Sequence, residues 1–305
     1  MKNLIGSFVV IAVIMAWTMR PSAYGFDVYV SNAGTDAGVC TPTAPCATFA
    51  YAFTQFQTPG VNGVIRVMNA GNYGSVVITH GVTIDGGDMA SNTVNIGLPV
   101  ASIFRVAAGT SDTVTIKNLT ISGINGIGGN EPSAIAVTSV GALHVENCTF
   151  VGFGSAAIDF RATGALLDMK NVTITDMPNA NGVYVANARA TLEHVSISRT
   201  QTAVLAAGSS TVSIAHSTVN GNASGFVAAY GPTAEIHIDD CTMTNNQWAV
   251  VAGQGATAYV SRSSLTNNVI AALFNDGTSH LISYGDNRFA SNASDGAFTG
   301  MASMK

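Results

Sequence analysis

The chain has 305 residues, of which 47% are hydrophobic and only 10% are charged, and its 17 acidic residues outnumber its 12 basic ones. This balance excludes nucleic acid as an expected partner, because binding to phosphates needs a basic surface. The mean hydropathy of +0.33 is high for a soluble protein, so the distribution of the apolar residues must decide whether the chain enters a membrane.

Residues 1–25 are predicted to be a signal peptide. The only long uninterrupted apolar segment runs from Leu4 to Trp17 behind a lysine, and small residues follow it in Pro21-Ser-Ala-Tyr-Gly25. The segment is short for a membrane span and has the flanks of a cleaved leader. We therefore expect no membrane span in the mature chain, a net charge of about −7 after removal of two basic residues, and a secreted or periplasmic location.

Residues 26–62 are predicted to hold an N-terminal strand and a capping helix. Between positions 47 and 56, four apolar side chains fall on one helical face: Phe49, Ala52, Phe53 and Phe56. Such a helix is expected to plug the first coil of the fold described below, because an uncovered end exposes unpaired strand groups.

The four cysteines divide into two pairs. Cys40 and Cys46 flank five residues near the N-terminus, and we predict a disulfide between them because an exported protein meets oxidising conditions. Cys148 and Cys241 occupy one repeat column four coils apart, so roughly 19 Å separates them and each is expected to be a buried free thiol.

Residues 63–291 are dominated by a repeat. An equivalent apolar residue returns every 22 to 24 positions, with one step of 29, at Ile121, Phe150, Ile174, Ile197, Val219, Met243, Leu265 and Phe289. Each copy contains three short strands with alternating apolar residues, separated by turns. This pattern predicts an all-β, right-handed parallel β-helix of roughly ten coils, about 50 Å long, followed by a tail over residues 292–305. A leucine-rich repeat is the alternative solenoid, but its fixed leucine phrase is absent.

Several apparent motifs are explained by the repeat columns. One turn column holds Asn118, Asn147, Asn171, His194, His216, Asp240, Arg262 and Asp286, and asparagine suits it because that residue tolerates a left-handed backbone. The pair Asp239-Asp240 also lies in ordinary columns. An outward column of alternating charge, expected to form a surface ladder, contains Lys117, Glu146, Lys170 and Glu193. The spacing of the six histidines indicates no metal site.

Several segments together resemble bacterial exported right-handed β-helix proteins of the pectin-lyase-like superfamily. They are Val28-Tyr-Val-Ser-Asn-Ala-Gly-Thr-Asp36, the Ala-Pro-Cys-Ala-Thr-Phe cap, Ile65-Arg-Val, Val82-Thr-Ile-Asp-Gly-Gly87 and the repeats. The superfamily includes lyases, polygalacturonases, mannuronan epimerases, tailspikes and adhesins, so the fold does not specify the chemistry. The Asp-Pro-His-Asp phrase of the epimerases is absent, and no residue is assigned as catalytic.

The resemblance implies a sugar groove on the outer face of the strand that begins each coil. We predict ligand-binding residues on the early part of this face: Arg66, Arg105, Asp159, Arg161 and Tyr184. A guanidinium group binds a uronate carboxylate through two parallel hydrogen bonds, and tyrosine stacks on sugar rings. Asp85, Asp88 and Glu131, in or beside the longest insertions, are candidate calcium ligands, and calcium is the one cofactor considered.

Two functions follow as hypotheses, and the sequence leaves open whether the protein is an enzyme. The first is an exported carbohydrate-binding or surface structural protein, with self-association through an apolar row formed by Leu205, Val227, Val251 and Leu273, unless the tail from Asn292 covers it. The alternative is a polysaccharide lyase, epimerase or hydrolase that acts on an acidic polysaccharide along the face described above.

Overall fold

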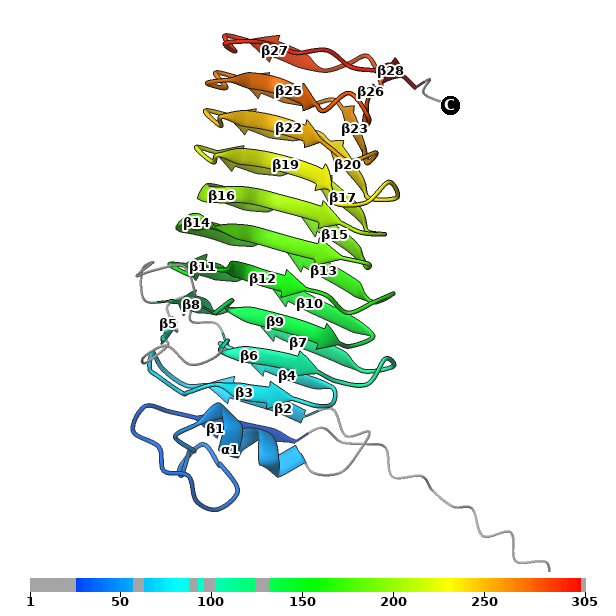
Figure 1. Cartoon of the computed structure of the whole chain (residues 1–305). Helices are drawn as coiled ribbons and strands as arrows, with labels where there is room; N and C mark the ends of the chain where they lie inside the picture. Colours follow the sequence, from blue (N-terminus) through cyan, green and yellow to red (C-terminus); the bar gives the residue numbers. More distant parts are fainter. Residues whose placement is uncertain (1–25, 57–62, 88–92, 96–101, 124–131, 303–305) are drawn as a thin grey trace, which may run out of the picture.

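The computed structural model describes residues 26–56, 63–87, 93–95, 102–123 and 132–302. Over these ranges the chain winds into a parallel β-solenoid of about nine turns, close to the ten expected (Figure 1). The predicted signal peptide, Asp88 and Glu131 lie outside the described residues. No helix in the described ranges is long and apolar enough to cross a membrane.

One long sheet, with twelve strands among the described residues, runs the length of the rod. Its strands, in spatial order, are β1 (Asp27–Val30), β2 (Gly63–Val67), β4 (Val82–Asp85), β7 (Thr113–Lys117), β10 (Ala142–Glu146), β13 (Leu166–Lys170), β15 (Arg189–Glu193), β17 (Thr211–Ala215), β20 (Glu235–Asp239), β23 (Thr257–Ser261), β26 (His280–Ser283) and β28 (Gly300–Met301). We call this the long-strand sheet because the sheet as a whole extends along the entire rod, although its individual strands are short.

The second sheet contains two rows of strands that β14 and β16 join, because each of these continues through the bend between the rows. The row that begins each coil consists of β3 (Val76–Ile78), β6 (Phe104–Ala107), β9 (Ile135–Ser139), β12 (Ala156–Phe160), β14 (Thr173–Ala186), β16 (Ser196–Ala207), β19 (Ser224–Ala229), β22 (Trp248–Ala252) and β25 (Ala271–Asn275). The shorter row consists of β5 (Thr93–Asn95), β8 (Thr120–Ser122), β11 (Thr149–Val151), β18 (Thr218–Asn220), β21 (Thr242–Thr244), β24 (Ser264–Thr266) and β27 (Arg288–Ala290).

The strands pair in register from coil to coil, so equivalent residues stack in columns. Leu143 lies between Val114 and Leu167, for example, and all three are fully buried. Burial of such apolar columns along the whole rod removes about 25 cal/mol of unfavourable hydration free energy per Å². This is the core that the alternating pattern predicts.

The turn after the long-strand sheet is left-handed, as predicted for its asparagine column. Asn118, Asn147 and Asn171 have φ angles of 59°, 52° and 54°. The amide of Asn171 donates to Asn147 and that of Asn147 donates to Asn118, each at 3.1 Å. These bonds tie successive coils together, which explains why the three asparagines belong to structure.

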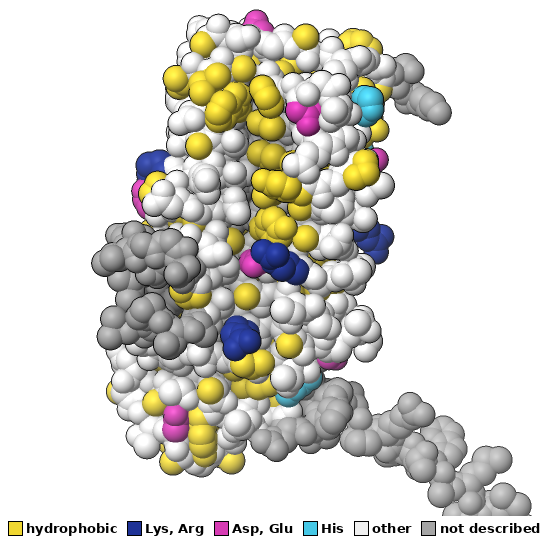
Figure 2. Space-filling model, viewed as in Figure 1, with side chains coloured by type: hydrophobic (Ala, Val, Ile, Leu, Met, Phe, Trp, Pro, Cys, Tyr) yellow, Lys and Arg dark blue, Asp and Glu magenta, His cyan; other side chains and the backbone are white. Residues whose placement is uncertain are grey.

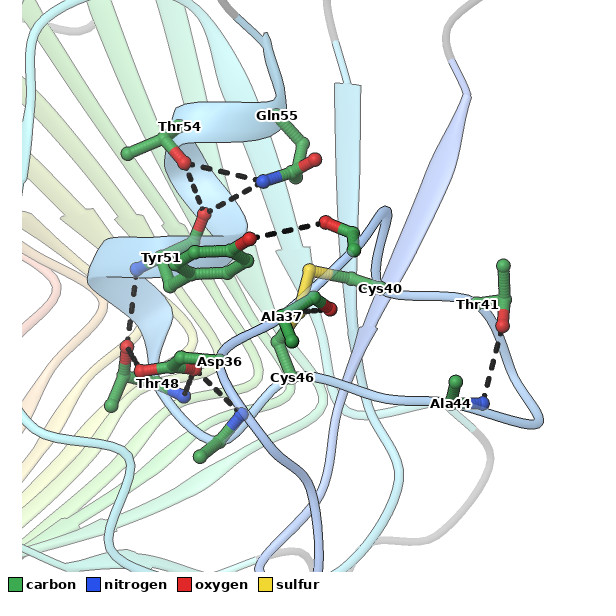
Figure 3. Close-up of a disulfide and its surroundings, with 12 residues drawn as sticks. Asp36, Ala37, Cys40, Thr41, Ala44, Cys46, Thr48, Tyr51, Thr54 and Gln55 are labelled. Atoms are coloured by element: carbon green, nitrogen blue, oxygen red, sulfur yellow. Dashed lines mark hydrogen bonds between the residues drawn. A yellow bond between two sulfur atoms is a disulfide. The ribbon is translucent and has the colours of Figure 1, made fainter.

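The N-terminal cap has the amphipathic helix expected for it. Helix α1 (Phe49–Phe53) continues as a 3-10 turn (Thr54–Phe56), and the four apolar residues of its inner face are buried. Thr48 begins the helix by accepting a hydrogen bond from the amide of Tyr51, and Asp36 accepts from Thr48 (Figure 3). A disulfide joins Cys40 to Cys46 beside this helix (Figure 3).

The C-terminal residues continue the solenoid instead of forming a separate tail. Asn292 accepts a hydrogen bond from the amide of Asn268, and β28 pairs with β26. The described part of this segment therefore extends both sheets by a partial coil and does not cross the apolar row.

Candidate functional site

Three of the predicted binding residues meet on the outer face of the first row of strands. Nε of Arg161 donates to Asp159 at 2.7 Å, and its guanidinium lies 4.5 Å from the centre of the Tyr184 ring. The hydrogen bond to Asp159 raises the pKa of Arg161. Arg105 stands exposed in the same column, separated from Asp159 by Ala136. Four of the five residues predicted to bind a ligand therefore lie on one face, and their binding stays a prediction.

Arg66 does not belong to that face, so this part of the prediction is wrong. It lies in β2 of the long-strand sheet, where it bonds Asp27 at 2.9 Å and Asp85 at 2.8 Å. Apolar and polar residues alternate with the same period in the strands of both sheets. Because the early coils carry insertions, the sequence does not show to which sheet a given early strand belongs. Arg66 and Asp85 instead extend the predicted charge ladder, because their strands place them in the column of Lys117.

The rest of the ladder has the register that the sequence predicts. Glu146 lies between Lys117 and Lys170, and Lys170 lies beside Glu193 with 3.6 Å between charged atoms. An ion pair this exposed contributes about 0.2–1 kcal/mol. The Lys170–Glu193 pair is therefore a small stabilising feature of the surface.

Asp85 is unsuited to bind calcium in this arrangement. Its Oδ2 faces the guanidinium of Arg66 and the ammonium of Lys117, while its Oδ1 accepts from the amides of Gly87 and Asn118. A calcium ion would have to displace two cations from a carboxylate that is nearly buried. Calcium binding at Asp85 would therefore require rearrangement of this ion-pair network.

The apolar row lies on the first row of strands, but its last member differs from the prediction. Leu205, Val227 and Val251 pair with one another across successive strands, and the next residue in the column is Phe274. Leu273 pairs with Val250 and points into the core. Figure 2 shows the hydrophobic stripe running along this face above the basic side chains.

Most of this row is covered by its own neighbours. Leu205 and Val227 are only 8% and 9% exposed and form a small cluster with Ala229, against which Tyr184 and Val251 pack. Phe274, by contrast, is 46% exposed. The surface available to a partner therefore lies at the C-terminal end of the row.

The outer face of the long-strand sheet carries a groove that the sequence analysis did not identify. Two hollows of about 310 and 440 Å³ share His237 and Asp239, so they form one depression along the rod. It extends from β15 to the residues that follow β26, and its lining consists of Thr191, Leu192, Glu193, Thr211, Ser213, Ile214, Ala215, His237, Ile238, Asp239, Tyr259, Ser261, Arg262, Tyr284 and Asp286. Hydroxyls, carboxylates and aromatic rings predominate.

Aromatic side chains give one end of the groove a defined shape. The rings of His237 and Tyr259 lie parallel, with centres 4.6 Å apart, and the ring of Tyr284 is tilted by 36° to that of Tyr259. Burial, with the nearby charge of Glu235, raises the pKa of Tyr259. Its hydroxyl therefore remains a hydrogen-bond donor at neutral pH.

Polar side chains in the groove are held by hydrogen bonds between coils. Asp239 accepts from the hydroxyl of Ser261 at 2.7 Å and from the guanidinium of Arg262. Burial raises the pKa of Asp239, but these two donors outweigh it and hold the pKa below its usual range. An ionised carboxylate can accept hydrogen bonds from a ligand, but it cannot act as a general acid.

The groove had a weak signal in the sequence. The sequence places Asp239 in a repeat column, but Tyr259 lies within β23 and Tyr284, 25 residues later, follows the end of β26. Only the register shows that the coils bring these rings together. The signal that would have found the groove is the replacement of Thr191 and Ser213 by His237 and Tyr259 in one column.

Comparison with known proteins identifies the family. The model of the right-handed β-helix region matches residues 133–294, more than half of the chain, so the protein belongs to the right-handed β-helix family. None of the curated proteins matches its sequence.

The solved structures that resemble this chain share little of its sequence. The A-module of the mannuronan C-5 epimerase AlgE6 of Azotobacter vinelandii is 9% identical, with a TM-score of 0.44, over 79% of this chain and 88% of that one. The GH136 lacto-N-biosidase from Eubacterium ramulus is 10% identical, with a TM-score of 0.43, over 88% and 68%. A rhamnogalacturonan lyase is 11% identical, with a TM-score of 0.39, over 88% of each chain.

Proposed function

We propose that the protein is a carbohydrate-binding β-helix that holds an extended glycan in the groove of the long-strand sheet. The observation that carries this proposal is the continuity of two hollows through His237 and Asp239. At about 4.8 Å per strand, the groove is on the order of 20 Å long, enough for several sugar units. A chain of hydroxyls, ring edges and carboxylates suits sugars, whose hydroxyls need many donors and acceptors.

The charge of the groove favours a neutral or aminated glycan. Glu193, Asp239 and Asp286 line it, and the single arginine of the lining, Arg262, is already paired with Asp239. Asp286 forms no ion pair among the described residues, so it would repel a uronate carboxylate. Because the lowered pKa of Asp239 keeps its carboxylate ionised, this residue favours glycan binding over hydrolysis that needs a general acid.

The test is a binding screen of the untagged protein against neutral, aminated and acidic polysaccharides. We expect Tyr259→Ala to weaken binding of the best polymer at least about fivefold, because a buried aromatic anchor typically contributes more than about 1 kcal/mol. Tyr230→Asn is the matched control, since Tyr230 is 62% exposed, lies outside the groove lining and has a φ of 60° that asparagine tolerates.

Two results would contradict this proposal. Binding that is equally reduced by both variants would place the glycan elsewhere, and absence of binding to every polymer would leave a structural role. Release of reducing ends or unsaturated products from a polymer would instead support the enzyme hypothesis.

A second candidate surface for an acidic polysaccharide is the cluster of Asp159, Arg161 and Tyr184, with Arg105 beside it. Arg105 is exposed and has no ion-pair partner among the described residues, so it is available to a uronate carboxylate. Arg161→Gln would weaken binding of acidic polymers alone. Loss of binding to neutral polymers in that variant would exclude this assignment.

A further inference from the structure

Two histidines and a glutamate meet at the turn that follows the long-strand sheet. His194 and His216 occupy equivalent left-handed positions on successive coils, with ring centres 5.3 Å apart. Nε2 of His194 lies 3.7 Å from Oε1 of Glu193, and Nδ1 of His216 lies 3.9 Å from the same oxygen. One donor atom from each residue lies within 4.8 Å of the others.

We propose that Glu193, His194 and His216 bind a divalent transition metal ion such as Zn²⁺. Imidazole nitrogen and carboxylate oxygen are the donors that zinc takes at about 2.0–2.2 Å. Tetrahedral ligands at that range lie about 3.3–3.5 Å from one another. The distances from Glu193 exceed this by a few tenths of an ångström, and the two imidazole donors lie within 4.8 Å of each other. Rotation of these half-exposed side chains would bring the three donors to the range that a metal requires.

The surroundings of the three donors fit the same role. Nε2 of His216, the nitrogen that does not face Glu193, lies 3.7 Å from Oδ2 of Asp240. A carboxylate in that position orients a metal-binding imidazole and raises its basicity. Lys170 approaches the other oxygen of Glu193, Oε2, at 3.6 Å and leaves Oε1 to the metal.

The thiols of the protein do not compete for this metal. Burial raises the pKa of Cys148 and of Cys241 to about 12, so both remain protonated at neutral pH. Zinc binds the thiolate form. Metal bound by the folded protein is therefore assigned to the cluster of Glu193, His194 and His216, of which Glu193 also lines the groove.

The experiment is calorimetric titration of the untagged, chelator-treated protein with ZnCl₂. His194→Asn and His216→Asn are conservative, because the equivalent turn position is asparagine at Asn118, Asn147 and Asn171. We expect one equivalent of zinc in the wild type and a loss of affinity of at least about tenfold in either variant. Asp240→Asn, which preserves side-chain shape, should weaken binding about tenfold.

His280→Asn is the control, because His280 is exposed at the start of β26 and belongs to neither the cluster nor the groove. Its affinity should equal that of the wild type. The proposal is overturned if the wild type binds no stoichiometric zinc, or if both His194→Asn and His216→Asn bind it as tightly as the wild type. Thermal unfolding of each metal-free variant shows whether the fold is retained.

Discussion

At the scale of single residues, Asp85 is a nearly buried carboxylate held by several hydrogen bonds and ion pairs. It joins three coils, because it bonds Arg66 from the preceding strand and Lys117 and Asn118 from the following one. Its own side chain is only 7% exposed. The residue singled out as a metal ligand is thus better explained as the centre of an ion-pair network.

Asp85→Asn should lower the free energy of unfolding by about 1–2 kcal/mol at pH 7, because two partly exposed cations lose their anionic partner. Burial raises the pKa of Asp85, but its hydrogen bonds and the two cations outweigh this and lower it below 3.8. The stabilisation is therefore present above pH 3.8 and disappears as the pH falls through the lowered pKa.

Urea denaturation of both proteins at pH 7 and at about pH 2 measures this dependence. The difference between them should shrink in acid. Asp168→Asn is the control. The side chain of Asp168 is 42% exposed, so this substitution should lower the free energy of unfolding by less than about 0.5 kcal/mol. A difference of equal size at both pH values would show that the charge of Asp85 is irrelevant.

At the scale of elements, the cap is a local unit stabilised by the disulfide. Replacing Cys40 and Cys46 by serine opens a seven-residue loop, and chain entropy predicts a cost of about 2 kcal/mol. In a solenoid each coil contacts only its neighbours, so the effect should remain near the N-terminus. Hydrogen exchange should accelerate over residues 26–56 and stay unchanged beyond β13. Thr43→Ala in the same loop is the control, and uniform acceleration along the rod would contradict the prediction.

The elements also show what the sequence could predict. The helix, the strand triplets and the asparagine column follow from local periodicity, because each coil repeats the same environment. Local periodicity does not show on which face of a strand a given side chain lies. Leu273 and Phe274 lie 22 and 23 residues after Val251, and both spacings occur in the repeat. A shift of one residue moves a side chain to the other face. The groove depends on the same cross-coil register, which explains why its aromatic residues were missed.

At the scale of the whole molecule, the rod presents a groove lined by hydroxyls, carboxylates and aromatic rings on one sheet and an apolar row on the other. Coverage of Leu205 and Val227 confines the accessible apolar surface to the C-terminal coils, where Val269, Ile270 and Phe274 are 66%, 44% and 46% exposed. Trp248 lies 6.4 Å from Phe274, ring centre to ring centre. Large exposed apolar patches commonly mark interfaces.

We therefore expect self-association through this end of the rod, and Phe274→Lys should abolish it. Light scattering over a range of protein concentrations should show a rising mass for the wild type and a constant monomer mass for the variant.

Val77→Lys provides a matched control, because Val77 stands in the same strand row, is 47% exposed and lies at the other end of the rod. Leu273→Ala should behave differently again: its side chain is 4% exposed, so the substitution should cost about 2–5 kcal/mol of stability without preventing association of the folded protein. A wild type that stays monomeric at every concentration, or a Val77→Lys variant that dissociates in the same way, would show that the C-terminal patch is not an interface between copies of this chain.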